Sequence, residues 1–223
     1  MTSDRAQALR GLYAVTPETP DTAWLLERVE ECLGGGARLV QYRAKAIHPS
    51  RALEQARAIA QACRRHGAPL IVNDSVELAL AAGAQGVHLG RDDDDVASAR
   101  AAFPGAIIGA SCYNEPARAR SAARSGADYV AIGSMFASRS KPGATRAAPA
   151  QLAEAKRLSG LPVAAIGGIT PDNAAGLVAA GADMLAVISA VFEADDVRAA
   201  ARAFAQLFTT SQRHDVRDQP RAV

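Results

Sequence analysis

The stretch Gly126-Ala127-Asp128-Tyr129-Val130 has two related copies in the chain, Gly83-Ala84-Gln85-Gly86-Val87 and Gly181-Ala182-Asp183-Met184-Leu185. Each copy lies between an alanine-rich helical pattern and a short apolar run. A glycine at such a place ends the helix in the left-handed backbone conformation, and the chain turns directly into the next strand. The three copies therefore predict repeating helix–strand units of similar length within one domain.

Eight short runs rich in valine, isoleucine and leucine are predicted to be strands, and alanine-rich helical patterns separate them. The predicted strands are residues 12–16, 38–43, 70–73, 86–89, 107–111, 129–133, 163–167 and 184–189. The predicted helices are residues 22–33, 51–65, 76–82, 95–102, 116–124, 149–158, 171–180 and 196–208. Strands that are apolar on both faces and alternate with helices are typical of a parallel sheet covered on both sides.

This pattern favours an α/β fold of one domain, a closed (β/α)8 TIM barrel. The competing fold is an open doubly wound sheet, which usually has fewer strands and a glycine-rich turn after its first strand. Here the first run ends in Thr16-Pro17-Glu18, without such a turn. We expect an N-terminal segment at residues 1–11, the barrel catalytic domain at 12–208 and a disordered tail at 209–223, because the tail is polar and lacks periodicity.

Composition limits the classes of function. Of the 223 residues, 49% are hydrophobic and 22% charged, which is typical of a globular protein. A net charge of +2 gives no long-range attraction to nucleic acid or to an anionic membrane. Three separated cysteines argue against a disulfide framework or a structural zinc site. The start of the chain has no apolar core typical of a signal peptide, so we expect a cytoplasmic protein with small-molecule substrates. A homo-oligomer is compatible with the sequence.

Barrel active sites lie at the carboxyl ends of the strands. The second predicted strand continues into Gln41-Tyr42-Arg43-Ala44-Lys45. Because side chains alternate, Gln41, Arg43 and Lys45 are expected to face inward, and Tyr42 and Ala44 to face the helices. Two inward cations favour an anionic ligand, and the alternative is an internal salt bridge with a neighbouring strand's carboxylate.

Acidic residues follow the third and fourth predicted strands, at Asn73-Asp74 and in the run Asp92-Asp93-Asp94-Asp95. Carboxylates from neighbouring strand ends can reach one cation, and such oxygen ligands suit Mg²⁺. The alternative is that the run is the acidic first turn of a helix. Both can hold, with Asp94 and Asp95 as helix caps.

The remaining strand ends suggest phosphate binding. Ser111 could donate a hydrogen bond to a phosphate or cap a helix. The segment from Gly133 to Ala144 is the longest strand-to-helix connection, and we interpret it as a lid, the alternative being a solvated basic loop. Loops after strands seven and eight, with Gly167-Gly168 and Ser189, fit the usual barrel phosphate site, the alternative being two tight turns. No general base is evident between the cations and carboxylates at strands two to four and the phosphate-binding loops after strands seven and eight. This suits a reaction in which diphosphate leaves.

Taken together, six phrases resemble the thiamine phosphate synthase family over nearly all of residues 12–208. The phrases are Leu12-Tyr13-Ala14-Val15-Thr16, Gln41-Tyr42-Arg43-Ala44-Lys45, Val72-Asn73-Asp74, Gly86-Val87-His88-Leu89-Gly90, Ile166-Gly167-Gly168-Ile169 and Val187-Ile188-Ser189. The resemblance implies a transferase of thiamine biosynthesis. It would join 4-amino-2-methyl-5-(diphosphooxymethyl)pyrimidine to thiazole phosphate or its carboxylate, by Mg²⁺-assisted loss of diphosphate and attack of the thiazole nitrogen.

The resemblance also implies roles for single residues. Asp74 and Asp93 would hold Mg²⁺, and Lys141, Ser111 and Arg43 would act in the reaction. The implied substrate-binding residues are Gln41, Tyr42, Arg43, Ala44, Lys45, Asn73, Ser111, Ser138, Arg139, Ser140, Lys141, Gly168, Ile188 and Ser189.

Two departures from the family pattern stand out. The family's lid usually contains Thr-x-Thr-Lys, and this chain has Ser138-Arg139-Ser140-Lys141. Arg91 stands where the family commonly has glutamine, which would add a charge near the metal. Two rival functions remain, a thiazole tautomerase on a related barrel and a non-catalytic protein that binds a thiamine precursor.

Overall fold

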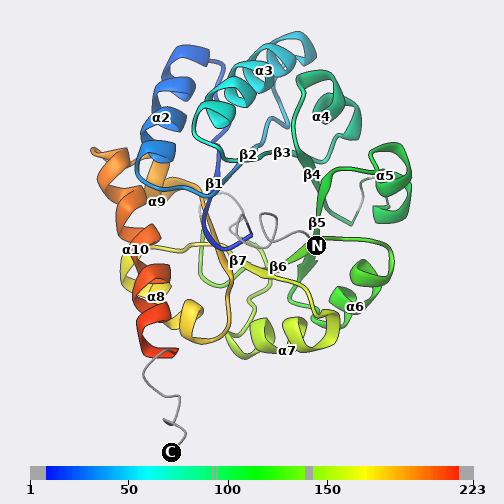
Figure 1. Ribbon diagram of the computed structural model, residues 1–223, viewed down its shortest axis with the longest axis vertical. Helices are drawn as coiled ribbons and strands as arrows, with labels where there is room; N and C mark the ends of the chain where they lie inside the picture. The colour runs from blue at the N-terminus through cyan, green and yellow to red at the C-terminus, as the bar shows by residue number, and fades with distance from the viewer. Residues whose placement is uncertain (1–8, 92, 94, 139–142, 216–223) are drawn as a thin grey trace, which may run out of the picture.

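The computed structural model describes residues 9–91, 93, 95–138 and 143–215, with only the backbone of residues 210–215. Eight parallel strands close into one barrel in sequence order, and β1 completes the ring by pairing with β8 (Figure 1). The strands are β1 (Gly11–Val15), β2 (Leu39–Tyr42), β3 (Leu70–Asn73), β4 (Gly86–Leu89), β5 (Ile107–Tyr113), β6 (Tyr129–Gly133), β7 (Val163–Ile166) and β8 (Met184–Val187). The predicted TIM barrel is confirmed, and the open sheet is wrong because the ring is closed.

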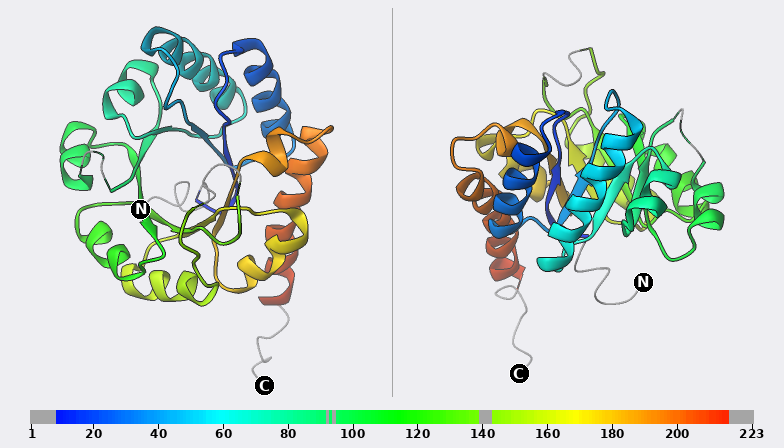
Figure 2. Two further views of the ribbon diagram at one scale, coloured as in Figure 1. Left: turned by 180° about the vertical axis from the view of Figure 1, so that it is seen from behind. Right: turned by 90° about the horizontal axis from the view of Figure 1, so that it is seen from above.

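Helices surround the strands on the outside of the ring, as the two views of Figure 2 show. The helices are α2 (Thr22–Gly34), α3 (Pro49–Arg65), α4 (Val76–Ala82), α5 (Val96–Ala102), α6 (Ala117–Arg124), α7 (Ala150–Ser159), α8 (Pro171–Ala179), α9 (Ser189–Phe192) and α10 (Val197–Asp215).

Several boundaries differ from the sequence expectation by one or two residues, and three differences concern the first and last parts of the barrel domain. The last strand ends at Val187, and Ser189 begins the short helix α9 instead of ending a strand. Helix α10 continues through Asp215, although the sequence pattern predicts its end at Phe208 and a disordered tail after it. Residues 209–215 contain no glycine or proline, so nothing in the backbone stops the helix there. Leu9, expected to lie outside the barrel domain, is only 1% exposed and packs in the inner apolar layer.

Side chains of successive strand residues alternate between two apolar layers. The inner layer fills the barrel and includes Tyr13, Ile71 and Tyr129. The outer layer lies between strands and helices and includes Tyr42, whose hydroxyl donates to Gln55 Oε1 of α3 at 2.7 Å. The inward Gln41 and outward Tyr42 therefore follow the predicted alternation.

The three repeated phrases have the same role at the amino-terminal ends of the strands. The third residue of each phrase makes two hydrogen bonds with one residue of the preceding strand. Its backbone N–H donates to the carbonyl oxygen of that residue, and its side-chain oxygen accepts from the N–H of the same residue. The pairs are Gln85 with Leu70, Asp128 with Ile108 and Asp183 with Val163, all at 2.7–2.9 Å. These bonds fix where each strand begins.

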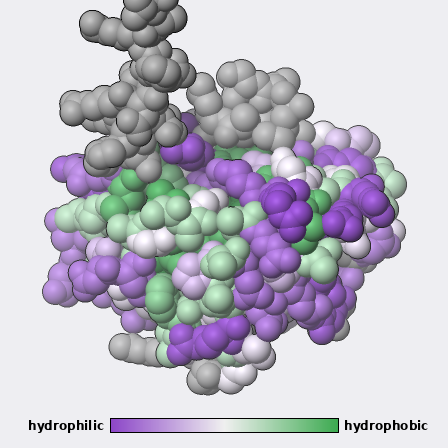
Figure 3. Space-filling view, turned by 90° about the horizontal axis from the view of Figure 1, so that it is seen from below, coloured by the Kyte–Doolittle hydropathy of each residue, from purple (hydrophilic) through white to green (hydrophobic). Residues whose placement is uncertain are grey.

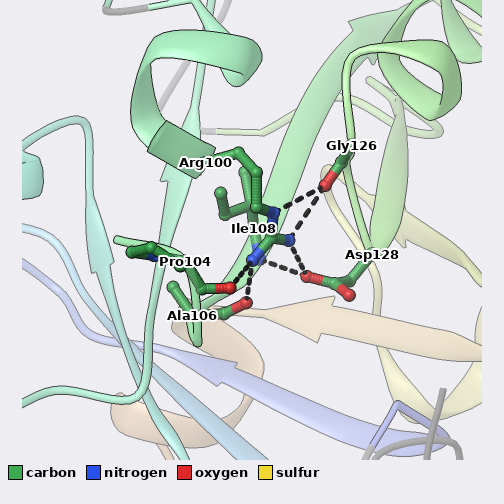
Figure 4. A network of polar contacts seen from close by, with 6 residues as sticks. All are labelled: Arg100, Pro104, Ala106, Ile108, Gly126 and Asp128. Carbon is green, nitrogen blue, oxygen red and sulfur yellow. Dashed lines mark hydrogen bonds and ion pairs between the residues drawn. The ribbon is translucent and has the colours of Figure 1, made fainter. Parts of the chain in front are cut away.

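Arg100 of α5 strengthens one of these junctions (Figure 4). Its guanidinium donates to Asp128 Oδ2 at 2.6 Å and to three backbone carbonyl oxygens, those of Pro104, Ala106 and Gly126. We call Arg100 and Asp128, with these carbonyls, the base clamp. All the donors of the clamp are used within the protein, which is the pattern of a structural contact.

The surface mixes hydrophilic and apolar residues on the face drawn in Figure 3. Among the described residues, Leu80 is the only large apolar side chain that is mostly exposed, at 50%. Within the same part of the chain, no helix has the length and apolar character needed to cross a membrane.

Candidate active site

A lysine and two aspartates meet at the carboxyl ends of β2, β3 and β4, and we call them the rim cluster. Lys45 Nζ lies 2.8 Å from Asp74 Oδ2. Asp74 directly follows β3, and its carboxyl group is hydrogen-bonded to that of Asp93, in the loop after β4. The Gly90 N–H donates to Asp93 Oδ2 at 2.6 Å and fixes this second carboxyl group. The structure thus brings together the three charged residues that the sequence predicts at this rim.

The backbone of Asp74 is strained. Its φ is +66°, in the left-handed region that few residues other than glycine adopt. Aspartate tolerates this conformation better than most residues, at a cost of order 1 kcal/mol. Its N–H donates to the His88 carbonyl of β4 at 2.9 Å, which holds the turn. The fold keeps a strained residue where the carboxyl group can meet both Lys45 and Asp93.

The two carboxyl groups have pKa values displaced in opposite directions. Burial opposes ionisation of Asp74, but the hydrogen bonds with Lys45 and Asp93 hold the pKa of Asp74 below its usual value. Burial and the hydrogen bond with Asp74 raise the pKa of Asp93. Such a pair titrates as a unit, and both groups are ionised only above the raised pKa of Asp93. A divalent cation bound between the two groups would neutralise both carboxylates.

This donor set fits Mg²⁺ in one particular way. Two carboxylates on neighbouring loops are too few for a cage made of protein alone, and the described residues contain no cluster of three or more histidine, cysteine, aspartate or glutamate side chains. Mg²⁺ commonly binds one or two carboxylates and takes its other oxygens from water and a substrate phosphate. The rim cluster therefore suits an ion that arrives with, or receives, a diphosphate.

Arg43 lines a cavity of about 370 Å³. The cavity is lined by Thr16, Pro17, Glu18, Arg43, Ile188, Ser189 and Glu193, which come from the ends of β1, β2 and β8. The Arg43 N–H donates to Thr16 Oγ1 at 3.0 Å, and its Nη1 lies 3.8 Å from Glu18 Oε2. This ion pair is loose, so the guanidinium can turn toward an anion in the cavity.

The position of Glu18 removes one argument made from the sequence. That argument was that two inward cations are more than one internal salt bridge needs. The structure pairs each of them with its own carboxylate, Arg43 with Glu18 and Lys45 with Asp74. Glu18 also accepts the Ala46 N–H and so ties together the loops after β1 and β2. The count of cations alone therefore does not require an anionic ligand.

The loops after β7 and β8 contain glycines that allow close packing and backbone N–H groups that are available to a ligand. Gly167 and Gly168 have φ of +107° and +62°, and a Cβ on either would overlap the loop after β6, at Ser134 or Ala137. Both glycines are therefore needed for packing. Within the described part of the chain, the N–H groups of Gly168 and Ser189 donate to no protein acceptor. Such backbone donors are suited to a phosphate oxygen.

The other predicted site residues divide into three groups. Asn73 and Ser111 lie on β3 and β5, half-buried near the rim cluster. Ser111 does not cap a helix, because its Oγ is hydrogen-bonded to His88 Nε2 at 2.9 Å. Tyr42 and Ala44 face the outer layer, so only their backbone is available to a ligand. Ser138 lies in the loop after β6, and the predicted Arg139, Ser140 and Lys141 lie outside the described residues.

Arg91 does not add an unpaired charge to the rim. Its guanidinium pairs with Glu115 and lies 4.9 Å from the centre of the Tyr113 ring. The charge that replaces the family's usual glutamine is thus met by a carboxylate on the loop after β5. Asp95 is the N-cap of α5, as expected, and Asp94 lies outside the described residues.

Sequence reasoning missed two groups of residues. Glu18 and Glu193 line the cavity, and only the position of Glu18 after the first strand could have indicated this. The buried Tyr13, His88 and Tyr129 form hydrogen bonds inside the barrel. Inward positions of His88 and Tyr129 follow from strand alternation, but their contact does not.

Comparisons with known proteins agree with one another. The family model described as thiamine monophosphate synthase matches residues 12–191. A thiamine-phosphate synthase of Methylobacillus flagellatus is 54% identical over 209 residues, which cover 93% of this chain and 100% of the relative. Another, of Aromatoleum aromaticum, is 53% identical over 201 residues, 90% of this chain and 97% of the relative.

Solved structures give the same result. Thiamine phosphate pyrophosphorylase from Pyrococcus furiosus superposes with a TM-score of 0.83 and 35% identity, covering 92% of this chain and 98% of that one. A 3-hexulose-6-phosphate synthase superposes with a TM-score of 0.65 at 18% identity, covering 88% of this chain and 99% of that one, and shares only the fold. The match over residues 12–191 and the identities above 50% establish that this chain belongs to the thiamine monophosphate synthase family.

Proposed function

We propose that this chain is a thiamine-phosphate synthase. It joins 4-amino-2-methyl-5-(diphosphooxymethyl)pyrimidine to thiazole phosphate and releases thiamine phosphate and diphosphate. The carbon–oxygen bond to diphosphate breaks, the diphosphate takes the electron pair, and the thiazole nitrogen supplies the pair for the new carbon–nitrogen bond. With the carboxylated thiazole phosphate, carbon dioxide is released as well.

The rim cluster would receive the diphosphate. Asp74 and Asp93 would hold Mg²⁺, which when bound neutralises charge on the leaving diphosphate. Lys45 lies within an ion-pair distance of Asp74, so its ammonium group can bind a diphosphate oxygen beside the metal. Arg43 and Ser111 would add donors from β2 and β5, and Lys141 would add a cation from the loop after β6. Positive groups fixed around the leaving group stabilise the charge that develops on it.

Gln41 and Asn73 would hold the pyrimidine. The Gln41 amide is oriented by its Nε2, which donates to Tyr13 Oη at 2.7 Å. That bond leaves its Oε1 as an acceptor, which suits the exocyclic amino group of the pyrimidine. The side chain is 4% exposed, so a ligand that reaches it has entered the mouth of the barrel.

The cavity beside Arg43 would receive the thiazole phosphate. The N–H groups of Gly168 and Ser189 would bind its phosphate, with Ile188 at the start of α9 and the hydroxyl groups of Ser138 and Ser140 from the loop after β6. Arg43 lines this cavity and lies two residues before Lys45 of the rim cluster. It would therefore bind between the two substrates.

The rim cluster is the observation that favours this function over the rivals. A tautomerase acts on a thiazole phosphate alone and needs no site for a metal-bound diphosphate. Two carboxyl groups in contact with each other beside a lysine form a site of that kind. A binding protein would have no need to keep the strained Asp74.

The test is direct turnover by the full-length chain. Both substrates and Mg²⁺ are expected to yield thiamine phosphate and diphosphate in equal amounts, and omission of either substrate is expected to abolish the product. Isomerisation of the thiazole phosphate without coupling would support the tautomerase. Tight binding of a substrate with no chemical change would support the binding protein.

A further inference from the structure

Five polar side chains form a hydrogen-bonded chain across the interior of the barrel. Gln41 Nε2 donates to Tyr13 Oη at 2.7 Å, and Tyr13 Oη lies 2.6 Å from Tyr129 Oη. Tyr129 Oη lies 2.9 Å from His88 Nδ1, and His88 Nε2 lies 2.9 Å from Ser111 Oγ. The first four side chains are buried, with at most 7% exposed, and Ser111 is half-buried at the rim. These hydrogen bonds thus connect Gln41 of β2 with Ser111 of β5 across the barrel.

A glycine makes this chain sterically feasible. His88, Gly109 and Tyr129 lie side by side in the register of β4, β5 and β6. A Cβ at Gly109 would overlap both the Tyr129 ring and His88 Nδ1. Because Gly109 has no side chain, the two rings on its flanks meet over it, with centroids 5.5 Å apart and an angle of 29° between their planes.

The number of protons available decides which atom donates in each of these hydrogen bonds. Burial raises the pKa of Tyr13 and of Tyr129, so both hydroxyl groups keep their protons. Tyr13 accepts from Gln41, and its own proton has Tyr129 as acceptor. Tyr129 then donates to His88 Nδ1. If the order were reversed while Gln41 still donated, Tyr13 would accept twice and its buried proton would lose its partner, at a cost of about 1–3 kcal/mol.

We propose that these hydrogen-bonded side chains fix His88 as the neutral tautomer protonated at Nε2. This tautomer makes Ser111 a hydrogen-bond donor toward the ligand. His88 Nε2–H donates to Ser111 Oγ. The Ser111 proton then points away from the imidazole, and among the described residues His88 is the only hydrogen-bond partner of Ser111 Oγ. Tyr129 and His88 are positioning residues in this scheme, and Ser111 is the group that touches the substrate.

The consequence for the reaction rests on the proposed function. A diphosphate oxygen can only accept hydrogen bonds, so Ser111 assists its departure only as a donor. With the opposite tautomer, the Ser111 proton would be used to bond bare His88 Nε2. The buried tyrosines, which cannot reach a ligand at the rim, would thus decide whether Ser111 can bind the leaving group.

The tautomer is measurable without substrate. In the ¹⁵N-labelled full-length protein, long-range ¹H–¹⁵N correlation spectra distinguish imidazoles protonated at Nε2 from those protonated at Nδ1. The His88 signals are assigned by their loss in His88→Gln. We expect a single Nε2–H pattern in the unmodified protein. An Nδ1–H or a doubly protonated His88 would overturn the inference. His88 would then donate to Tyr129, and the donor and acceptor of every hydrogen bond back to the Gln41 amide would be exchanged.

Two variants that each remove one buried hydroxyl test the cause. Tyr129→Phe removes the donor to Nδ1 and is expected to replace the Nε2–H pattern with a mixture of tautomers. Tyr42→Phe removes a buried tyrosine hydroxyl in the outer layer and is expected to leave the His88 pattern unchanged. Equal changes in the two variants, or none in either, would contradict the role of Tyr129. If Tyr129→Phe does not fold, the His88 tautomer measured in the unmodified protein still tests the proposal.

A double-mutant cycle links the tautomer to turnover. Tyr129→Phe is expected to lower kcat roughly tenfold, with a smaller effect on KM. In the Ser111→Ala background the same change is expected to cost less than about twofold, because the group it orients is gone. Equal losses of kcat in both backgrounds would show that Tyr129 acts only through packing and not through Ser111. Absence of turnover in the unmodified protein would refute the proposed function and leave the tautomer assignment intact.

Discussion

The base clamp and the rim cluster are both built from oppositely charged side chains at the ends of neighbouring strands, yet they differ in every physical respect. The Arg100 guanidinium in the clamp donates to one carboxylate and three carbonyl oxygens, and the Asp128 side chain is 12% exposed. In the rim cluster Lys45 is 52% exposed, Asp74 has a left-handed backbone, and the carboxyl groups of Asp74 and Asp93 are in hydrogen-bond contact.

The difference separates stability from function within one barrel. Hydrogen bonds in the clamp satisfy buried groups and fix the start of β6. The rim cluster brings like charges together at a strained backbone, which lowers stability unless a cation or an anionic ligand completes it. In barrels of this type the amino-terminal ends of the strands contribute stability and the carboxyl ends hold the chemistry.

The largest effect is expected from the rim. Asp74→Asn keeps the size of the side chain and tolerates the left-handed backbone, but removes the charge. Turnover is expected to fall on the order of 1,000-fold, with the thermal midpoint nearly unchanged. Asp172→Asn, an exposed change on α8, serves as the control and should retain activity. Near-normal turnover of Asp74→Asn at limiting Mg²⁺ would refute its role as a metal ligand.

The clamp should show the reverse behaviour. Arg100→Met keeps the length of the stem and removes every hydrogen bond of the guanidinium. The free energy of unfolding is expected to fall by about 2–4 kcal/mol, measured by denaturant titration, with kcat per folded molecule unchanged.

The matched control for the clamp is Arg57→Met, which removes one exposed hydrogen bond to the Ala81 carbonyl and should cost less than about 0.5 kcal/mol. Similar losses in the two variants would mean that the clamp is no more than a surface contact.

The smallest effect is expected from Asp93→Asn. Folding raises the pKa of Asp93, so the unmodified fold loses stability as pH rises through that pKa. The variant has no such loss, and near neutral pH it should be more stable in the absence of Mg²⁺ by a few tenths of a kcal/mol. The gain should vanish as pH falls through the raised pKa and Asp93 becomes protonated. A variant that is less stable at neutral pH would show that attraction to Lys45 outweighs both the burial of Asp93 and its repulsion from Asp74.

Several elements were predictable because their cause is local. Strands β3, β4 and β6 match the predicted bounds, since each is an apolar run that ends at glycine, asparagine or aspartate. That Lys45, Asp74 and the acidic run after the fourth strand meet followed from parallel strands, whose carboxyl ends lie at one rim. The resemblance to the family singled out Asp93 in that run. Helix α9 was missed because four residues give no periodicity.

The amino-acid sequence by itself determined the barrel and the rim at which charged residues gather, because strand alternation and the repeated helix–strand unit depend on near neighbours in the chain. Only the tertiary structure decided that Arg43 faces Glu18 and that Tyr13 and Tyr129, 116 residues apart, share a hydrogen bond. It also showed that Gln85, Asp128 and Asp183 bond the preceding strand. These contacts depend on the distance between side chains of different strands, which is set when the ring closes and which no local pattern contains.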